Sequence, residues 1–266
     1  MTRLKFPRRQ RREPEPVPET IPTPADDEAV GGPRMGFFEH LDELRQRLFK
    51  AFMALIAGTV AGMVLATPVL EYLVSPYGSR LQTLGPTESV VSYFRVSLML
   101  GGIIAIPIIT YQVLMFVIPG LTQKESRLLL RSLPAITLLF LVGVAFAWFI
   151  LVPPALNFLE NFQTAIYDPQ WTADQYLGFV TALLFWMGVA FETPLVFFVL
   201  ALLGLVSAGN LIRNWRIAVV GAAIAAAMIT PTIDPVNMFL VMGPLLGLYT
   251  LSIFLVMIGR RIAKVD

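Results

Sequence analysis

The stretch YLGFVTALLFWMGVAFETPLVFFVLALLGL, residues 176–205, decides the fold class, because Glu192 is its only charged side chain. Thirty residues at a rise of 1.5 Å would form a helix of roughly 45 Å, longer than the hydrocarbon core of a bilayer. The stretch therefore predicts a membrane-spanning helix. An ionised carboxylate at that depth costs about 2.5 kcal/mol or more, so we expect Glu192 to be protonated, partnered or facing a polar cavity.

The rest of the chain has the same apolar character. Apolar residues make up 56% of it and charged residues 14%, and the mean hydropathy is +0.70, which is typical of an integral membrane protein. Besides 176–205, apolar runs predict spans at 48–70, 94–118, 132–153, 217–230 and 236–258. Prolines inside the runs predict kinks. The expected fold is an all-α integral membrane protein, with six transmembrane helices in a concave, kinked bundle.

The fifth run is unusually short. Its apolar core, 217–229, would form a helix of only about 20 Å, too short to cross a hydrocarbon core of about 30 Å unaided. We expect this helix either to thin the bilayer or to be sheltered by its neighbours.

Lysine and arginine predict the orientation. The segment up to Lys50 holds ten of them, 119–131 three, 206–216 two and the C-terminus three, whereas the other side of the membrane would hold only Arg80 and Arg95. Positive charge favours the cytoplasmic side, so both termini are expected in the cytoplasm.

Composition also divides the chain. Residues 1–34 are basic and then rich in proline and acid, which predicts a disordered cytoplasmic tail. We expect the transmembrane domain over 35–259 and a short cytoplasmic tail over 260–266. The chain has no cysteine and one histidine, so thiolate and multi-histidine metal sites are excluded, and we expect no metal or cofactor.

Two motifs lie on the predicted cytoplasmic side. FFEHLDELRQRLF, residues 37–49, has leucines on one face and predicts an interfacial helix leading into the first span. Its Glu43 and Arg47 could form an ordinary i,i+4 pair on a membrane anchor. In YQVLMFVIPGLTQKESRLL, residues 111–129, Glu125 either completes a capping box with Thr122 or binds a cationic ligand.

Two G-x-x-x-G spacings, Gly58–Gly62 and Gly243–Gly247, permit close contact between helices. Because glycine is frequent in this sequence, chance is an equal explanation for either spacing.

Four motifs in order, HLDELRQRLF, IPIITYQVLMFVIPGLTQKESR, GVAFETPLVFF and ITPTIDP, resemble those of the TatC family, the multispanning core subunit of the twin-arginine protein translocase. The resemblance covers roughly residues 37–258. It implies a non-enzymatic receptor in the cytoplasmic (inner) membrane that binds twin-arginine signal peptides. It also implies assembly with single-span TatA- and TatB-type partners, export of folded proteins driven by the proton-motive force, possible self-association, and no nucleic-acid partner.

The resemblance also implies site residues. For signal-peptide binding these are Glu43, Glu125, Leu41, Arg45, Arg47, Phe116 and Pro119; for an intramembrane polar site or partner-helix contact they are Glu192, Pro194 and Asp234; and Pro76 matches a proline of the first external loop. Met238 stands where the family often has glutamine. Asp234 matches the acidic residue that follows a Thr-Pro pair in the family, but here one extra residue separates it from that pair.

Two other classes of protein fit the sequence less well. A proton-coupled solute transporter would use Glu192 as its relay, but such folds usually contain two matching halves, and no second half is found here. A membrane enzyme would need a catalytic motif, and the sequence contains neither G-x-S-x-G nor H-E-x-x-H.

Overall fold

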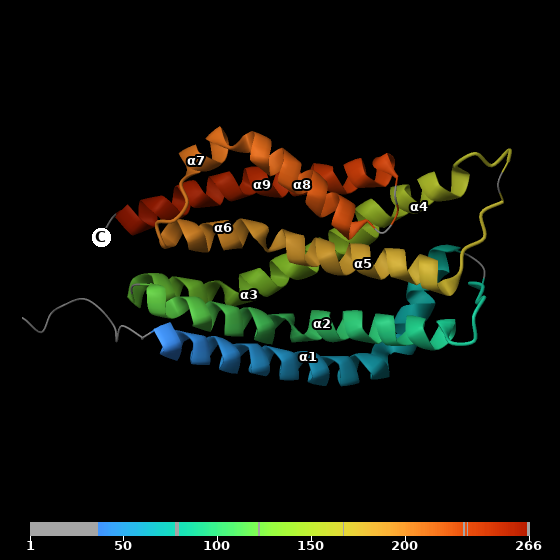
Figure 1. Ribbon diagram of the computed structural model, residues 1–266, viewed down its shortest axis with the longest axis horizontal. Helices are drawn as coiled ribbons and strands as arrows, with labels where there is room; N and C mark the ends of the chain where they lie inside the picture. Colours follow the sequence, from blue (N-terminus) through green and yellow to red (C-terminus); the bar gives the residue numbers. More distant parts are fainter. Residues whose placement is uncertain are drawn as a thin grey trace, which may run out of the picture. The chain divides into compact units, whose positions relative to one another are not determined.

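A computed structural model describes residues 37–77, 80–121, 123–166, 168–230, 232 and 234–264. Apart from one isolated bridge between Gln82 and Thr172, the regular elements in this part of the chain are helices. They are α1 (Phe37–Val74), η1 (Ser75–Tyr77), α2 (Glu88–Val117), η2 (Ile118–Gly120), α3 (Gln123–Phe146), η3 (Ala147–Leu151), α4 (Val152–Asn161), α5 (Ala173–Phe191), α6 (Thr193–Leu202), α7 (Ala208–Arg213), α8 (Trp215–Ile229) and α9 (Pro235–Lys264) (Figure 1). The predicted tail over 1–34 and Thr122 of the predicted capping box lie outside the described residues.

All six predicted apolar runs are helical. Among the described residues, five helical segments are long and apolar enough to cross a membrane: Phe38–Tyr77, Glu88–Val117, Gln123–Asn161, Ala173–Leu202 and Pro235–Arg260. Helix α8 is shorter, and its 15 residues give about 22 Å of helix, as the short fifth run predicts. The chain is therefore an all-helical, multi-pass membrane protein.

The prolines affect the helices unequally. Pro107, Pro134 and Pro244 lie inside helices that continue past them, whereas the run 176–205 divides at Pro194 into α5 and α6. Proline has no N–H, and here Glu192 adopts a turn, in which its N–H donates to the Val189 carbonyl at 3.0 Å. The predicted interruption of this span is therefore found at Glu192.

One irregularity was not predicted. Helix α3 passes into α4 through a π-helical turn, Ala147–Leu151, immediately before Pro153 and Pro154. Two consecutive prolines lack the N–H groups that a regular helix would use, and a wider turn lets the helix continue past them.

Glycines bring α1 and α2 together. A Cβ added to Gly58 would lie 2.5 Å from the Gly101 carbonyl oxygen, and one added to Gly62 would lie 2.5 Å from that of Ser97. The two helices therefore contact each other backbone to backbone, as the first G-x-x-x-G spacing permits. At Gly247, and equally at Gly243, an added Cβ would meet nothing within 4 Å in the described chain, so the second spacing forms no such contact.

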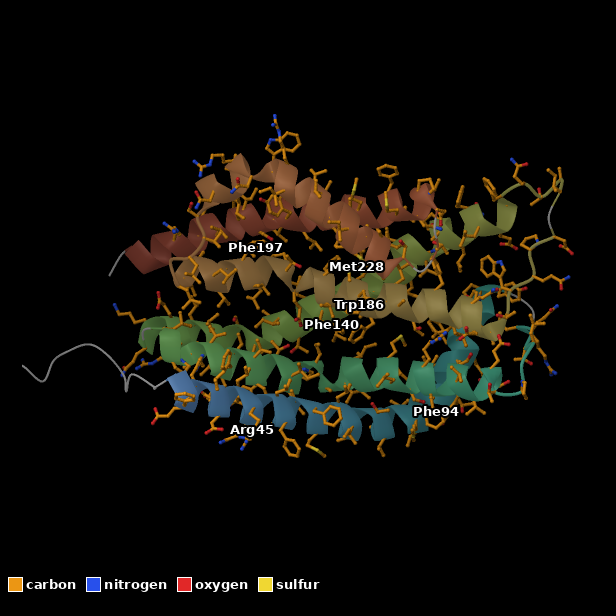
Figure 2. All side chains as sticks on the ribbon, in the orientation of Figure 1. Arg45, Phe94, Phe140, Trp186, Phe197 and Met228 are labelled. Carbon is orange, nitrogen blue, oxygen red and sulfur yellow. The ribbon has the colours of Figure 1, made fainter. Side chains whose placement is uncertain are left out.

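Helix α5 lies against the centre of the packed side chains. Tyr176, Val180, Leu183 and Met187 point inward from it and are buried, and Phe140 of α3 packs beside it (Figure 2). Apolar side chains such as Met228 are exposed on the outside, as expected for a surface that faces lipid.

The helices run between two ends of the bundle. We call the end at which α1 begins and α2 ends the proximal end, and the end at which α2, α5 and α9 begin the distal end (Figure 1).

Candidate functional site

A carboxylate is held at the proximal end by side chains from two helices. Arg47 donates from Nη2 to Glu43 Oε1 at 3.2 Å, one turn along α1, and from Nη1 to Gln112 Oε1 of α2 at 3.4 Å. The side chains of Glu43 and Arg47 are only 15% and 21% exposed. The predicted i,i+4 pair therefore exists, and Gln112 ties it to α2.

The second oxygen of Glu43 is placed differently. Oε2 is buried and has no hydrogen-bond donor among the described residues; His40 Nδ1 lies 3.8 Å away. The His40 ring stacks on Phe116, with centroids 4.3 Å apart and planes 15° apart, so this wall of the site is fixed to the last turn of α2. The arrangement leaves one carboxylate oxygen whose capacity to accept a hydrogen bond is unused among the described residues.

Glu125 lies at the same end. It stands half-buried in the first turn of α3, just after Pro119 and the η2 turn, in which Leu121 N–H donates to the Ile118 carbonyl. An acidic residue in a first turn also interacts favourably with the helix dipole. The structure thus places Glu43 and Glu125 at one end of the bundle, on either side of the end of α2.

Two other predicted residues of α1 point outward. Leu41 is exposed, and Arg45 is exposed and makes a long, 4.0 Å contact to Asp42 (Figure 2). They offer an apolar and a cationic surface beside Glu43 and have no role in the packing of the bundle.

Glu192 lies further into the bundle, at the turn between α5 and α6. Its Oε1 accepts a hydrogen bond at 3.4 Å from the hydroxyl of Thr110, a buried residue of α2, and Pro194 beside it is buried. The carboxyl therefore has a donor inside the bundle, which answers part of the sequence expectation that it needs a partner.

Asp234 caps α9 at the distal end. Its Oδ1 accepts from the Asn237 N–H at 2.7 Å, and its Oδ2 accepts from the Asn237 side-chain amide at 2.9 Å. Burial raises the pKa of Asp234, but these hydrogen bonds outweigh it and hold that pKa below its ordinary value. A capping role accounts for this carboxylate without a ligand.

Pro76 lies in η1, directly after α1, and is exposed. With Tyr77, Trp148 and neighbouring residues it lines a cavity of about 330 Å³ at the distal end.

Comparison with known proteins decides the family. Residues 39–244 match the family model described as Sec-independent protein translocase protein (TatC). The chain is 36% identical to the Sec-independent protein translocase protein TatC of Synechocystis sp. over 224 residues, which cover 84% of this chain and 88% of the relative. The chain belongs to the TatC family. It is also 36% identical to the chloroplastic TATC of Arabidopsis thaliana, over 90% of this chain and 71% of that protein.

The fold agrees with that of solved members of the TatC family. A crystal structure of the twin arginine translocase receptor TatC superposes with a TM-score of 0.75 at 36% identity, covering 83% of this chain and 99% of the other. A second crystal structure, of the twin arginine translocase receptor TatC in DDM, superposes with a TM-score of 0.75 at 37% identity. It covers 81% of this chain and 98% of the other. The relatives and solved structures given above are all named as protein translocase components. Protein transport across a membrane is therefore the function of the family.

Sequence reasoning missed three residues around the TatC motifs. Gln112, His40 and Thr110 each contact a predicted site residue. Gln112 and Thr110 could have been found as polar side chains inside the apolar run of α2, but their partners lie 65 and 82 residues away in sequence.

Proposed function

We propose that this protein is the core receptor of a twin-arginine translocase, and that it binds the paired arginines of a signal peptide at its proximal end. The observation that carries the proposal is the Glu43 carboxylate, fixed by Arg47 with its Oε2 left without a donor among the described residues.

Arginine suits this acceptor. Its planar guanidinium presents several N–H groups, and a charge-assisted hydrogen bond to a carboxylate contributes about 1.5–3 kcal/mol. We propose that one signal arginine binds Glu43 and that the other binds Glu125, across the end of α2. Lysine presents a single ammonium group and fits a planar acceptor less well.

The residues around the two glutamates would receive the rest of the peptide. Leu41 offers an apolar surface on α1, Phe116 forms a wall with His40, and Pro119 marks the turn that precedes Glu125. Arg45, which is exposed on α1, would favour acidic or polar peptide groups next to the arginine pair.

Glu192 and Pro194 suit a second role. The turn between α5 and α6 interrupts the helix inside an apolar span, and a carboxyl there can exchange its 3.4 Å hydrogen bond to Thr110 for a polar group on an incoming helix. We propose that single-span TatA- and TatB-type proteins contact the receptor here, and that the complex exports folded proteins using the proton-motive force. Asp234, as the cap of α9, would support this function by fixing the start of that helix.

The bias of lysine and arginine supports an inner-membrane orientation in which the proximal end and both termini face the cytoplasm. An impermeant label added to intact cells should then reach the segment 154–175, which includes the connection between α4 and α5, and not the segment 119–131, which includes the start of α3.

Photocrosslinking tests the binding site. Probes at positions 43 and 125 should capture a twin-arginine peptide, and a peptide with lysine in place of both arginines should be captured far less. Equal capture of the two peptides, or capture at neither position, would refute the proposed site.

A further inference from the structure

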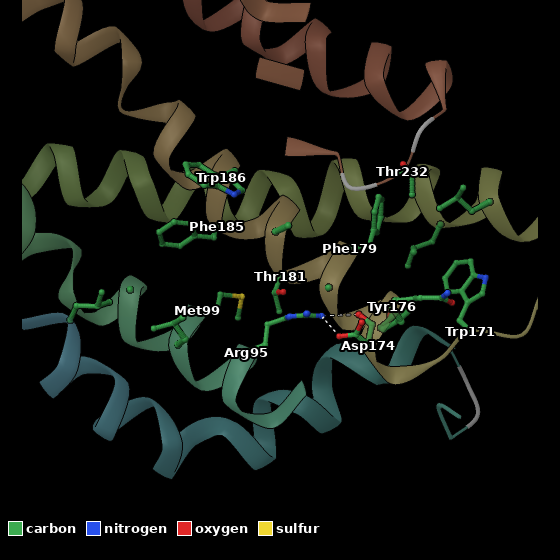
Figure 3. A pocket seen from close by; sticks show the side chains of 18 residues that line it. Arg95, Met99, Trp171, Asp174, Tyr176, Phe179, Thr181, Phe185, Trp186 and Thr232 are labelled. Carbon is green, nitrogen blue, oxygen red and sulfur yellow. Dashed lines mark hydrogen bonds and ion pairs between the residues drawn. The ribbon is translucent and has the colours of Figure 1, made fainter. Parts of the chain in front are cut away.

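A cavity of about 900 Å³ lies on the distal half of the bundle, between α2, α4 and α5 (Figure 3). Its volume falls within the range of about 300–1,000 Å³ that is common for ligand pockets. The walls are largely apolar and include Met99, Phe179, Phe185 and Trp186. Trp186 is half exposed on the outer surface, so the cavity opens toward the lipid-facing side.

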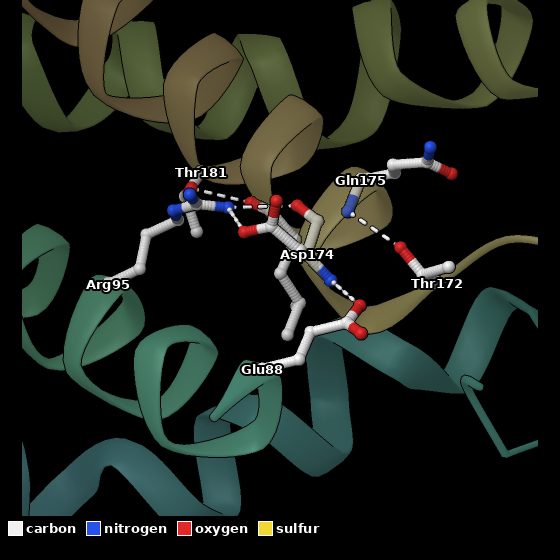
Figure 4. A network of polar contacts seen from close by, with 7 residues as sticks. Glu88, Arg95, Thr172, Asp174, Gln175 and Thr181 are labelled. Atoms are coloured by element: carbon white, nitrogen blue, oxygen red, sulfur yellow. Dashed lines mark hydrogen bonds and ion pairs between the residues drawn. The ribbon is translucent and has the colours of Figure 1, made fainter. Parts of the chain in front are cut away.

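An ion pair stands in the wall of this cavity. Nη1 of Arg95 in α2 lies 2.8 Å from Asp174 Oδ1 in an ion pair and donates to the Asp174 carbonyl at 2.8 Å (Figure 4). Asp174 is itself fixed, since its N–H donates to Glu88 Oε1 at 2.8 Å. A Cβ on Gly178 would lie 2.7 Å from Arg95 Nη1, so the missing side chain gives the guanidinium room to lie on the backbone of α5.

Part of the hydrogen-bonding capacity of this pair is unused. Among the described residues, no group bonds to Arg95 Nε or Nη2 or to Asp174 Oδ2, although a guanidinium has five N–H donors and a carboxylate two acceptor oxygens. The two side chains are 35% and 50% exposed. The pair therefore presents a hydrogen-bond donor and an acceptor, side by side, to a ligand in the cavity.

The pair lies near the distal ends of α2 and α5. Asp174 lies in the first turn of α5, and Arg95 lies two turns, or roughly 10 Å, from the start of α2. Charged side chains and aromatic rings gather at this level in membrane proteins, and Trp171 also lines the cavity.

We propose that this cavity binds one molecule of phosphatidylethanolamine. The phosphate accepts from the free N–H groups of Arg95, the primary ammonium donates to Asp174 Oδ2, and an acyl chain fills the apolar part of the cavity. The charges decide this choice, since the pair is neutral overall and matches a headgroup that carries both signs. A phosphatidylglycerol headgroup has no cation for Asp174, and the quaternary ammonium of phosphatidylcholine has no N–H to donate.

Native mass spectrometry and thermal unfolding of the purified full chain test the proposal. Phosphatidylethanolamine, phosphatidylcholine and phosphatidylglycerol with identical acyl chains are added separately. We expect one molecule of phosphatidylethanolamine to stay bound and to raise the unfolding temperature, because a ligand that binds only the folded state stabilises it. The other two lipids should show at least about tenfold lower occupancy, equivalent to 1.4 kcal/mol.

Variants separate headgroup binding from acyl-chain binding. Arg95→Gln and Asp174→Asn should lose the preference for phosphatidylethanolamine, and Ala182→Phe, which adds bulk to the wall of the cavity, should lose bound lipid altogether. Arg80→Gln and Asp168→Asn, exposed charges outside the cavity, should bind as the unaltered chain does.

Three outcomes would overturn the proposal. They are equal occupancy by all three lipids, an unchanged preference in Arg95→Gln, and displacement of the lipid by a twin-arginine peptide or a single-span partner, which would assign the cavity to a protein ligand. If Arg95→Gln fails to fold, Asp174→Asn and Ala182→Phe decide the matter.

Discussion

Arg47 neutralises one oxygen of Glu43, at 3.2 Å, and leaves the other without a donor among the described residues. The receptor thus carries an arginine of its own on the carboxylate that is proposed to bind a ligand arginine. A ligand guanidinium at Oε2 would complete the pairing and would have no need to displace Arg47.

The first prediction separates binding from stability at Glu43. Glu43→Gln should lower the affinity for a twin-arginine peptide by about 10- to 100-fold, because a charge-assisted hydrogen bond is lost. The unfolding free energy should fall by only about 1–3 kcal/mol, because the largely buried Arg47 loses a charged partner but can still donate to the glutamine. Fluorescence anisotropy with a labelled peptide and thermal unfolding measure the two effects. Asp42→Asn is the control, since Asp42 is 70% exposed on the same turn; an equal loss of affinity in it would mean that general negative charge is responsible.

The second prediction concerns Glu125. Glu125→Ala and Glu125→Gln should both abolish tight peptide binding if the charge binds an arginine, whereas only the alanine variant should disturb a helix cap. The same anisotropy assay distinguishes them. Normal affinity in Glu125→Gln would assign Glu125 to capping α3.

The third prediction concerns Glu192. Glu192→Ala should reduce co-purification of the single-span partners and export more strongly than it reduces peptide binding. Glu192→Gln, which keeps a side chain able to bond Thr110, should retain most partner contact. Partner recovery and peptide affinity, measured on the same preparations, test this. If peptide binding is lost while partners are retained, the assignment is reversed.

The fourth prediction concerns helix packing. Gly58→Ala and Gly62→Ala should destabilise the protein by about 1–3 kcal/mol, since the added methyl group would collide with backbone atoms of α2. Gly243→Ala and Gly247→Ala make the same change where nothing lies within 4 Å and should leave the unfolding temperature unchanged or slightly higher. Similar destabilisation in both pairs would show that the α1–α2 contact is not special.

The fifth prediction is a pH effect at Asp234. Because hydrogen bonds hold its pKa below the ordinary 3.8, the ionised cap stabilises the fold above that pH, and this stabilisation is lost as the pH falls through the lower folded-state pKa. Asp234→Ala should cost about 1 kcal/mol at pH 7, as for other lost caps. The difference in unfolding free energy between the unaltered protein and Asp234→Ala should shrink below pH 4. A difference that is constant with pH would exclude a role for the charge.

Hydropathy alone predicted every membrane helix, because burial in lipid demands long apolar runs and leaves little choice of secondary structure. The apolar run 132–153 marks only part of its helix, because polar residues at a helix end carry no apolar signal; α3 begins at Gln123, where the capping-box motif predicts a helix start. The π-helical turn at Ala147–Leu151 also has no signature in the sequence beyond the two prolines that follow it.

The candidate sites were predicted only in part. Individual carboxylates such as Glu192 stand out against apolar surroundings, and so they could be named. Their partners could not, because pairs such as Glu192 with Thr110 and Arg95 with Asp174 join residues 82 and 79 positions apart. Such pairs depend on how helices pack, which local periodicity does not report.

The close contact between α1 and α2 also bears on how the protein is made. These helices are neighbours in sequence, and their closest contact joins Gly58 and Gly62 of α1 to Gly101 and Ser97 of α2. Helices that already span a membrane can associate through small residues, and domains generally assemble from the N-terminus during synthesis. The hairpin can therefore close while later helices are still on the ribosome, so that α5, which joins α2 through Arg95 and Asp174, docks onto a surface that is already formed.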